Sequence, residues 1–255
     1  MEAVLTEISR EEALRYLGVR GRPDAVLQAD LDRCAELLMA QARPRAVWKL
    51  FLREADGTLE GTAFCPAGQD IQRFLSGCGR VILMGATLGA EAETLLRRAQ
   101  AQAMGDALLL DALASAAVEN VCDNLCRDLA AHFSPDRLTS RFSPGYGDFP
   151  LSQQRELCAV LDLSRRLGVS LTPGGLMIPQ KSVTALIGVR SGETAPENLP
   201  GSARMESAED LLEGTAEKDR EICPESAAGC SGTGCSACGL SDHCQFKKED
   251  QSCGR

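Results

Sequence analysis

The chain has 255 residues, of which 44% are hydrophobic, and this is enough to build a sizeable core. Its formal net charge of −9 and the absence of a long basic run argue against a nucleic-acid partner. No stretch approaches the roughly 18 consecutive apolar residues that cross a membrane, and the first residues do not read as a signal peptide. We therefore expect a cytoplasmic protein with no membrane partner.

The uneven distribution of the cysteines divides the chain into two parts. Six of the twelve lie between Cys223 and Cys253, and the other six are scattered over the preceding 222 residues. Before this cluster, residues 192–225 hold ten Asp or Glu against three Lys or Arg. We predict a globular domain over 1–191, an acidic linker over 192–222 and a cysteine-rich tail over 223–255. The alternative for the linker is an acidic surface loop of the main domain.

The first part of the domain contains two helix patterns followed by two strand patterns. A short helix is predicted over 10–17, and a longer one follows Pro23 and Asp24, where apolar residues recur at helical spacing. Residues 46–53 are typical of a strand. Because Asp56-Gly57 is a hairpin signal, we expect residues 58–64 to pair back on that strand.

The rest of the domain adds helices and a few further strands. Since strands do not alternate regularly with single helices, the pattern favours an α+β fold with mixed helices packed on a twisted antiparallel sheet. The predicted helices cover 69–75, 90–103, 106–132 and 151–167, and the predicted strands cover 80–89, 169–172, 175–179 and 182–189. The helix over 106–132 is the longest, with a broad apolar band rich in small residues.

The loop over 141–150 has the features of a small-molecule clamp. Pro144 and Pro150 restrict the backbone, and Gly145 allows a positive φ or a close approach. Arg141 offers a planar fork of donors, and Tyr146 offers a ring and a hydroxyl. The alternative is an ordinary Pro/Gly turn between two helices.

Glu119 lies among apolar positions of the long predicted helix, where a carboxylate is either a solvated edge or a ligand contact. Cys122 and Cys126 follow it in helical phase, but no histidine or further cysteine lies within a turn of them. We therefore interpret the two thiols as small core residues rather than as metal ligands.

Two other classes of site are disfavoured. The Gly-rich turn after the strand over 80–89 lacks the Gly-Lys-Ser/Thr ending of a phosphate loop. The only histidines, His132 and His243, lie in no recognisable catalytic constellation, which argues against a hydrolase.

Three stretches resemble one known family. The segment from Arg141 to Tyr146 is similar to the Arg-x-x-x-Gly-Tyr motif of the activation domain of cobalamin-dependent methionine synthase, which binds S-adenosylmethionine. Residues 171–183 resemble its Leu-Thr…Met-x-Pro…Ser-Val segment, and residues 113–123 resemble the helix before its motif. Order and spacing agree over roughly residues 10–190. The resemblance implies a fold like that activation domain.

The resemblance also implies roles for individual residues. Arg141 would bind the methionine carboxylate of S-adenosylmethionine, and Glu119 would meet its amino group. Tyr146 and the backbone near Ser143 and Gly145 would hold the rest of the ligand. Ser143 stands where the family has alanine, and the family's N-terminal Asp-Trp-x-Pro segment has no equivalent here.

In that family, the domain supports a repair reaction in which cob(II)alamin receives an electron and then the methyl group of S-adenosylmethionine. This sequence lacks the Asp-x-His-x-x-Gly loop of cobalamin-binding domains. The resemblance therefore implies an accessory subunit that works on a separate corrinoid protein, methionine synthase or a related methyltransferase, with flavodoxin or ferredoxin as electron donor. The alternatives are a module that senses S-adenosylmethionine or handles corrinoid without methyl transfer, and a scaffold whose globular part binds nothing.

The tail combines six thiols with one imidazole in a polar, glycine-rich segment, a composition that favours metal binding. Either zinc or an iron–sulfur cluster would suit it. The alternatives are unligated thiols and redox disulfides. The candidate ligands are Cys230, Cys235, Cys238 and Cys244, with Cys223, Cys253 and His243 as further candidates.

Overall fold

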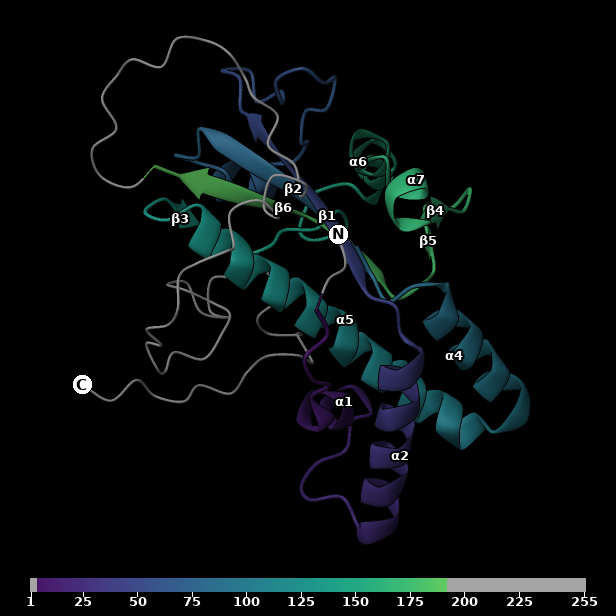
Figure 1. Ribbon diagram of the computed structural model, residues 1–255. Coiled ribbons are helices and arrows are strands. Elements are labelled where there is room, and N and C mark those ends of the chain that lie inside the picture. The colour runs from purple at the N-terminus through teal and green to yellow at the C-terminus, as the bar shows by residue number, and fades with distance from the viewer. Residues whose placement is uncertain (1–3, 192–255) are drawn as a thin grey trace, which may run out of the picture. The chain divides into compact units, whose positions relative to one another are not determined.

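A four-stranded antiparallel sheet lies at the centre of the computed structural model, which describes residues 4–191 (Figure 1). The strand order is β1-β2-β6-β3, so the α+β prediction with an antiparallel sheet is confirmed. In the register, Thr87 of β2 lies opposite both the first residue of β1 and Ser182 of β6. The strands are β1 (Arg45–Leu52), β2 (Arg80–Thr87), β3 (Arg137–Leu138) and β6 (Ser182–Arg190). The predicted linker and tail lie outside the described residues.

Both faces of the sheet are covered, which explains the continuous apolar run of β2. Side chains alternate between the two faces of a strand. Ile82 and Met84 accordingly join one apolar cluster, and Val81 and Leu83 join the other. A strand buried on both faces has no polar side to present, so its sequence does not alternate.

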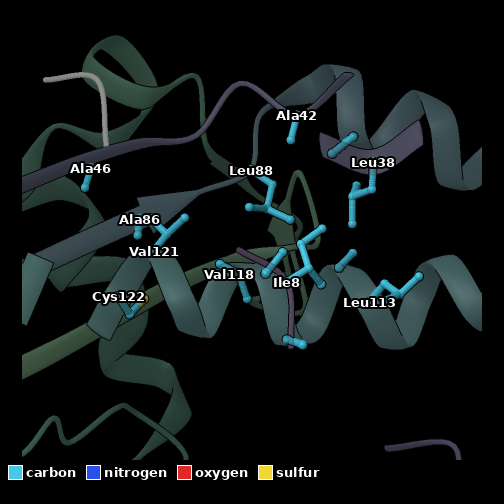
Figure 2. Packing of buried hydrophobic residues seen from close by; sticks show 14 of the residues in the cluster. Ile8, Leu38, Ala42, Ala46, Ala86, Leu88, Leu113, Val118, Val121 and Cys122 are labelled. Atoms are coloured by element: carbon cyan, nitrogen blue, oxygen red, sulfur yellow. The ribbon is translucent and has the colours of Figure 1, made fainter. Parts of the chain in front are cut away.

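Helix α5 (Met104–His132), 29 residues long, runs along one face of the sheet (Figure 1). Its residues Val118, Val121 and Cys122 lie among side chains of the sheet and of the N-terminal segment, including Ala86 and Ile8 (Figure 2). No helix within residues 4–191 is long and apolar enough to cross a membrane. The helices packed around α5 are α1 (Arg10–Tyr16), α2 (Ala25–Gln41) and α4 (Ala90–Gln102).

The opposite face is covered by shorter elements. A separate two-stranded ribbon of β4 (Ser170–Leu171) and β5 (Met177–Ile178) follows them. The helices on this face are α3 (Gln69–Phe74), the 3₁₀ turn η1 (Leu151–Gln153), α6 (Gln154–Leu161) and α7 (Leu163–Leu167).

The single helix predicted over 151–167 is wrong. The structure breaks it at Asp162, whose φ of 52° is left-handed. Leu161 and Leu163 are both buried, but residues two apart point in nearly opposite directions on a continuous helix. The break lets both leucines face the sheet. Leu163 then packs so closely on Gly85 that a Cβ there would lie 2.8 Å from its Cδ2.

The predicted strand over 58–64 is also wrong. The turn exists, since the Asp56 side chain accepts a hydrogen bond from the backbone N–H of Thr58. After one isolated bridge between Arg53 and Leu59, however, the chain turns again, with Leu59 bonded to Phe64. Leu59 and Phe64 are both buried. Strand β1 takes β2 as its partner instead.

Candidate functional site

The loop that starts at Arg141 is fixed to the sheet at its first residues. Phe142 exchanges two backbone hydrogen bonds with Leu186 of β6, of 2.9 and 2.8 Å. A turn follows, in which Tyr146 N–H donates to the Ser143 carbonyl at 3.2 Å. Gly145 has a φ of 95°, which favours glycine, and its N–H donates to the Phe149 carbonyl at 2.8 Å. The predicted stiffness of the loop therefore has a backbone basis.

The far end of the loop is fixed to α3. The carboxylate of Asp148 accepts hydrogen bonds from the backbone N–H groups of Asp70 and Gln69, at 2.9 and 2.6 Å. These bonds stabilise the ionised form and lower the pKa of Asp148. Gly147 lies so close to Asp70 that a Cβ would meet its carboxylate. Both ends of the loop are held by residues far away in sequence.

Arg141 points to the face of the sheet that carries α5. Phe142 packs in the apolar cluster of the opposite face, so its neighbour in extended backbone projects the other way. Nη2 of Arg141 donates to Oε2 of Glu119 at 2.7 Å, and Nη1 donates to Oδ1 of Asp123 at 2.6 Å. The Arg141 side chain is 21% exposed, whereas Glu119 and Asp123 are 40% and 47% exposed. We call these three residues the arginine cluster.

The resemblance implied that Arg141 and Glu119 meet the carboxylate and the amino group of the ligand's methionine end, whereas here they contact each other directly. A ligand carboxylate would therefore have to replace one of the two carboxylates now bonded to Arg141. The arrangement allows this exchange, because the carboxylates are more exposed than the guanidinium that holds them.

Two thiols lie beneath the arginine cluster. Cys122 is fully buried and Cys126 is half-buried, with its Sγ 3.6 Å from Nη1 of Arg141. Burial raises the pKa of both thiols, although the Arg141 guanidinium opposes the rise. Burial alone would lower the pKa of Arg141, but its neighbours Cys122, Cys126 and Asp123 outweigh burial and raise it. The guanidinium is charged and the thiols are neutral near pH 7, so the thiols are poor nucleophiles.

The described part of the chain holds no group of three or more residues suited to a metal ion. Cys122 belongs to the buried apolar cluster around α5, and Cys126 packs against it, which is the environment of core residues. The predicted metal ligands of the tail lie outside residues 4–191, so tail metal binding stays a prediction.

A second cation, Lys181, also forms side-chain contacts with α5, and the sequence analysis did not identify it. Lys181, just before β6, donates from Nζ to Ser115 Oγ at 2.9 Å and forms an ion pair with Asp111 Oδ1 at 2.9 Å. The Lys181 side chain is 14% exposed, and that of Asp111 is 53% exposed. A usable signal was present, because positions 111, 115, 119 and 123 recur every four residues and so share one face of a helix. We call Lys181, Asp111 and Ser115 the lysine cluster.

The remaining predicted ligand contacts lie in the loop. Tyr146 is exposed and Ser143 is half-buried, and neither hydroxyl bonds to any residue within 4–191. Both side chains are therefore accessible to a ligand. His132 lies elsewhere, with its ring 4.8 Å from that of Phe133 and 5.9 Å from that of Trp48.

Comparisons with known proteins give a structural likeness but no match to a family or to a curated protein. No protein-family model matches the sequence, and no curated protein matches it. Among solved structures, the chain resembles the MetH reactivation domain bound to AdoHcy, with a TM-score of 0.49 and 15% identity. The match covers 76% of this chain and 82% of that domain. A likeness at this level defines neither the family nor the ligand of this chain.

Proposed function

We propose that this protein binds S-adenosylmethionine on the open face of α5 and acts as an activation subunit that supports reductive methylation of cob(II)alamin on a separate corrinoid protein. The observation that carries the proposal is Arg141 held between Glu119 and Asp123. A guanidinium fork suits the carboxylate of an amino acid, and the two acidic side chains suit its ammonium group. Because the backbone at Phe142 is bonded to β6, Arg141 stays in place while the more exposed carboxylates adjust.

The net charge of this face supports a cationic ligand. Arg141 and Lys181 contribute two positive charges, and Asp111, Glu119 and Asp123 contribute three negative ones, so 2 − 3 = −1. S-adenosylmethionine carries an ammonium, a sulfonium and a carboxylate and has a net charge of +1, whereas loss of the methyl group removes the sulfonium charge. One unit of charge in a partly exposed site contributes on the order of 1 kcal/mol. The face therefore favours the methyl donor over its demethylated product.

The sequence motifs support the same ligand. The segment from Arg141 to Tyr146 and the segment over 177–183 occur in the order and spacing of the activation domain of methionine synthase. In this proposal, Tyr146 and the backbone at Ser143 and Gly145 also contact the ligand. The chain would contribute proximity and orientation, by holding the methyl donor at a fixed place. Cobalamin on the partner, reduced by flavodoxin or ferredoxin, would supply the cobalt that accepts the methyl group.

Titration with S-adenosylmethionine tests the site. We expect calorimetry to show an affinity about 30-fold lower or more for Arg141→Ala, which corresponds to roughly 2 kcal/mol for a lost charge-assisted contact. Arg97→Ala is the matched control, since Arg97 is an exposed arginine of α4 that pairs only with Glu93 among the described residues. Equal affinities of the wild type and Arg141→Ala would overturn the assignment.

A second experiment separates activation from sensing. The protein is mixed with cob(II)alamin-loaded methionine synthase, a reductant and S-adenosylmethionine labelled in its methyl group. We expect label on cobalt, and less of it with Arg141→Ala. Tight binding of S-adenosylmethionine without label on cobalt would leave a sensing or corrinoid-handling module as the function.

A further inference from the structure

A hollow of about 370 Å³ opens beside the N-terminal half of α5. Its walls come from the end of α1, from α4 and from α5, so three separate elements build it. Most of the lining is apolar, and a few polar groups converge on it, as in sites for small organic molecules. The lining includes Tyr16, Leu17, Gln100, Met104, Leu108 and Asp111.

The hollow and the arginine cluster share one face of α5. Asp111 and Ser115 line the hollow and are also the partners of Lys181. Tyr16 of α1 also lines the hollow, and burial followed by the carboxylates of Glu12 and Glu119 raises the pKa of its phenol. From Asp111 to Glu119 is eight residues, about 12 Å along a helix axis. This span is comparable to that between the purine and the carboxylate of an extended S-adenosylmethionine.

Resting on the function proposed above, we infer that this hollow receives the adenosine part of the ligand whose charged end lies at Arg141. The apolar side chains of Leu17 and Leu108 would contact the faces of the purine. The amide of Gln100 offers both a donor and an acceptor to the purine edge.

Asp111 suits the two hydroxyls of the ribose. Lys181 occupies Oδ1 of its carboxylate, and Oδ2 has no hydrogen-bond partner among residues 4–191. A carboxylate only accepts hydrogen bonds when ionised, and a ribose diol donates two. Lys181 would thus orient Asp111 while leaving one oxygen for the ligand.

The charged side chains next to the hollow also indicate which adenosine compounds it can bind. Asp111, Glu119 and Asp123 lie in a row along the face that continues from the hollow. Carboxylates in this arrangement repel the phosphates of ATP or ADP. The hollow therefore suits a nucleoside that continues into a cationic chain rather than a nucleotide.

Methionine methyl signals report occupancy directly. Met104 lines the hollow, and Met39 is an exposed methionine of α2 that serves as internal control. With ¹³C-methyl methionine labelling, we expect adenosine alone, and S-adenosylmethionine, to shift the Met104 signal through the ring current of the purine. The Met39 signal should stay in place.

Two variants of the hollow, Leu108→Trp and Asp111→Asn, test its contribution to ligand affinity, and Leu37→Trp is the control. Leu108→Trp fills the hollow from an exposed position, and Leu37→Trp makes the same change on the exposed side of α2. Asp111→Asn removes the charge with little change of volume. We expect Leu108→Trp and Asp111→Asn to weaken S-adenosylmethionine and adenosine by about tenfold or more, Arg141→Ala to weaken only S-adenosylmethionine, and Leu37→Trp to have no effect.

The outcomes separate the two proposals. If S-adenosylmethionine binds in an Arg141-dependent way, but Leu108→Trp and Asp111→Asn bind normally and Met104 does not shift, the inference about the hollow is overturned and the proposed function stands. If adenosine shifts Met104 while S-adenosylmethionine binds without Arg141, the hollow stands and the arginine site falls. If neither compound binds the wild type, both are overturned.

Discussion

The arginine cluster and the lysine cluster hold the same face of α5 in different ways. Arg141 divides its fork between two carboxylates one turn apart, whereas Lys181 holds one carboxylate and one hydroxyl. The arginine cluster has a net charge of 1 − 2 = −1, and the lysine cluster has 1 − 1 = 0. The first is suited to a charged amino-acid end with a surplus cation, and the second to an uncharged group. In the proposals above, these different charge balances would let one helix face bind the two ends of one ligand.

The largest effect is expected when Arg141 is removed. Arg141→Met leaves Glu119 and Asp123 one turn apart without a cation, so like charges repel across a partly buried site. We expect the free energy of unfolding, measured with urea, to fall by about 1–3 kcal/mol, since exposure of the carboxylates reduces the cost. Adding Glu119→Gln should recover part of the loss. An unchanged stability, or no recovery in the double variant, would contradict this account of the cluster.

A smaller effect is expected for the lysine cluster. Lys181→Met leaves only Asp111 without its cation, and that carboxylate is more than half exposed and can turn to water. The free energy of unfolding should fall by about 0.5–1 kcal/mol. If Lys181→Met lowers the free energy of unfolding as much as Arg141→Met does in parallel urea titrations, the expected difference between the two clusters is contradicted.

The smallest effect concerns Cys126 and is a shift in pH dependence. Burial raises the pKa of this thiol, and the neighbouring guanidinium holds the rise down, so Arg141→Met should raise the pKa further and Lys181→Met should not change it. The rate of alkylation by iodoacetamide, followed against pH, gives the midpoint in each variant. A downward shift in Arg141→Met, or equal shifts in both, would show that the guanidinium does not act on the thiol.

The raised pKa of Cys126 also predicts how the free energy of unfolding depends on pH. A thiol with a raised pKa binds its proton more tightly in the folded state than in the unfolded state. Its contribution is therefore complete below the ordinary thiol pKa and is lost as the pH rises towards the folded value. Urea unfolding of the wild type above pH 9 should show this loss, and Cys126→Ser should reduce it.

Local sequence patterns correctly predicted the elements whose apolar residues follow one simple pattern along the whole element. The helix over 106–132 and the strand over 80–89 were predicted because their apolar residues repeat with one period or run without interruption. The segment over 151–167 also has a helical period, but Leu161 and Leu163 must both reach the sheet, and a straight helix cannot do this. Residues 58–64 have a genuine turn signal and fail as a strand because Leu59 and Phe64 bury themselves in a second turn.

Prediction of the site from the sequence was limited in the same way. Arg141 and Glu119 were singled out from their sequence context, but nothing in the sequence said that they bond to each other. Lys181 escaped notice because its partners lie 66 and 70 positions earlier in the chain.

By itself, then, the sequence determined what depends on near neighbours: the long helix, the rigid Arg141 loop and the α+β class. The tertiary structure decided which distant side chains meet, because the pairing of β6 with Phe142 and the packing of α5 on the sheet bring Arg141 and Lys181 over one helix face. Ion pairs and hollows arise from such contacts between segments, and no local period in the chain encodes them.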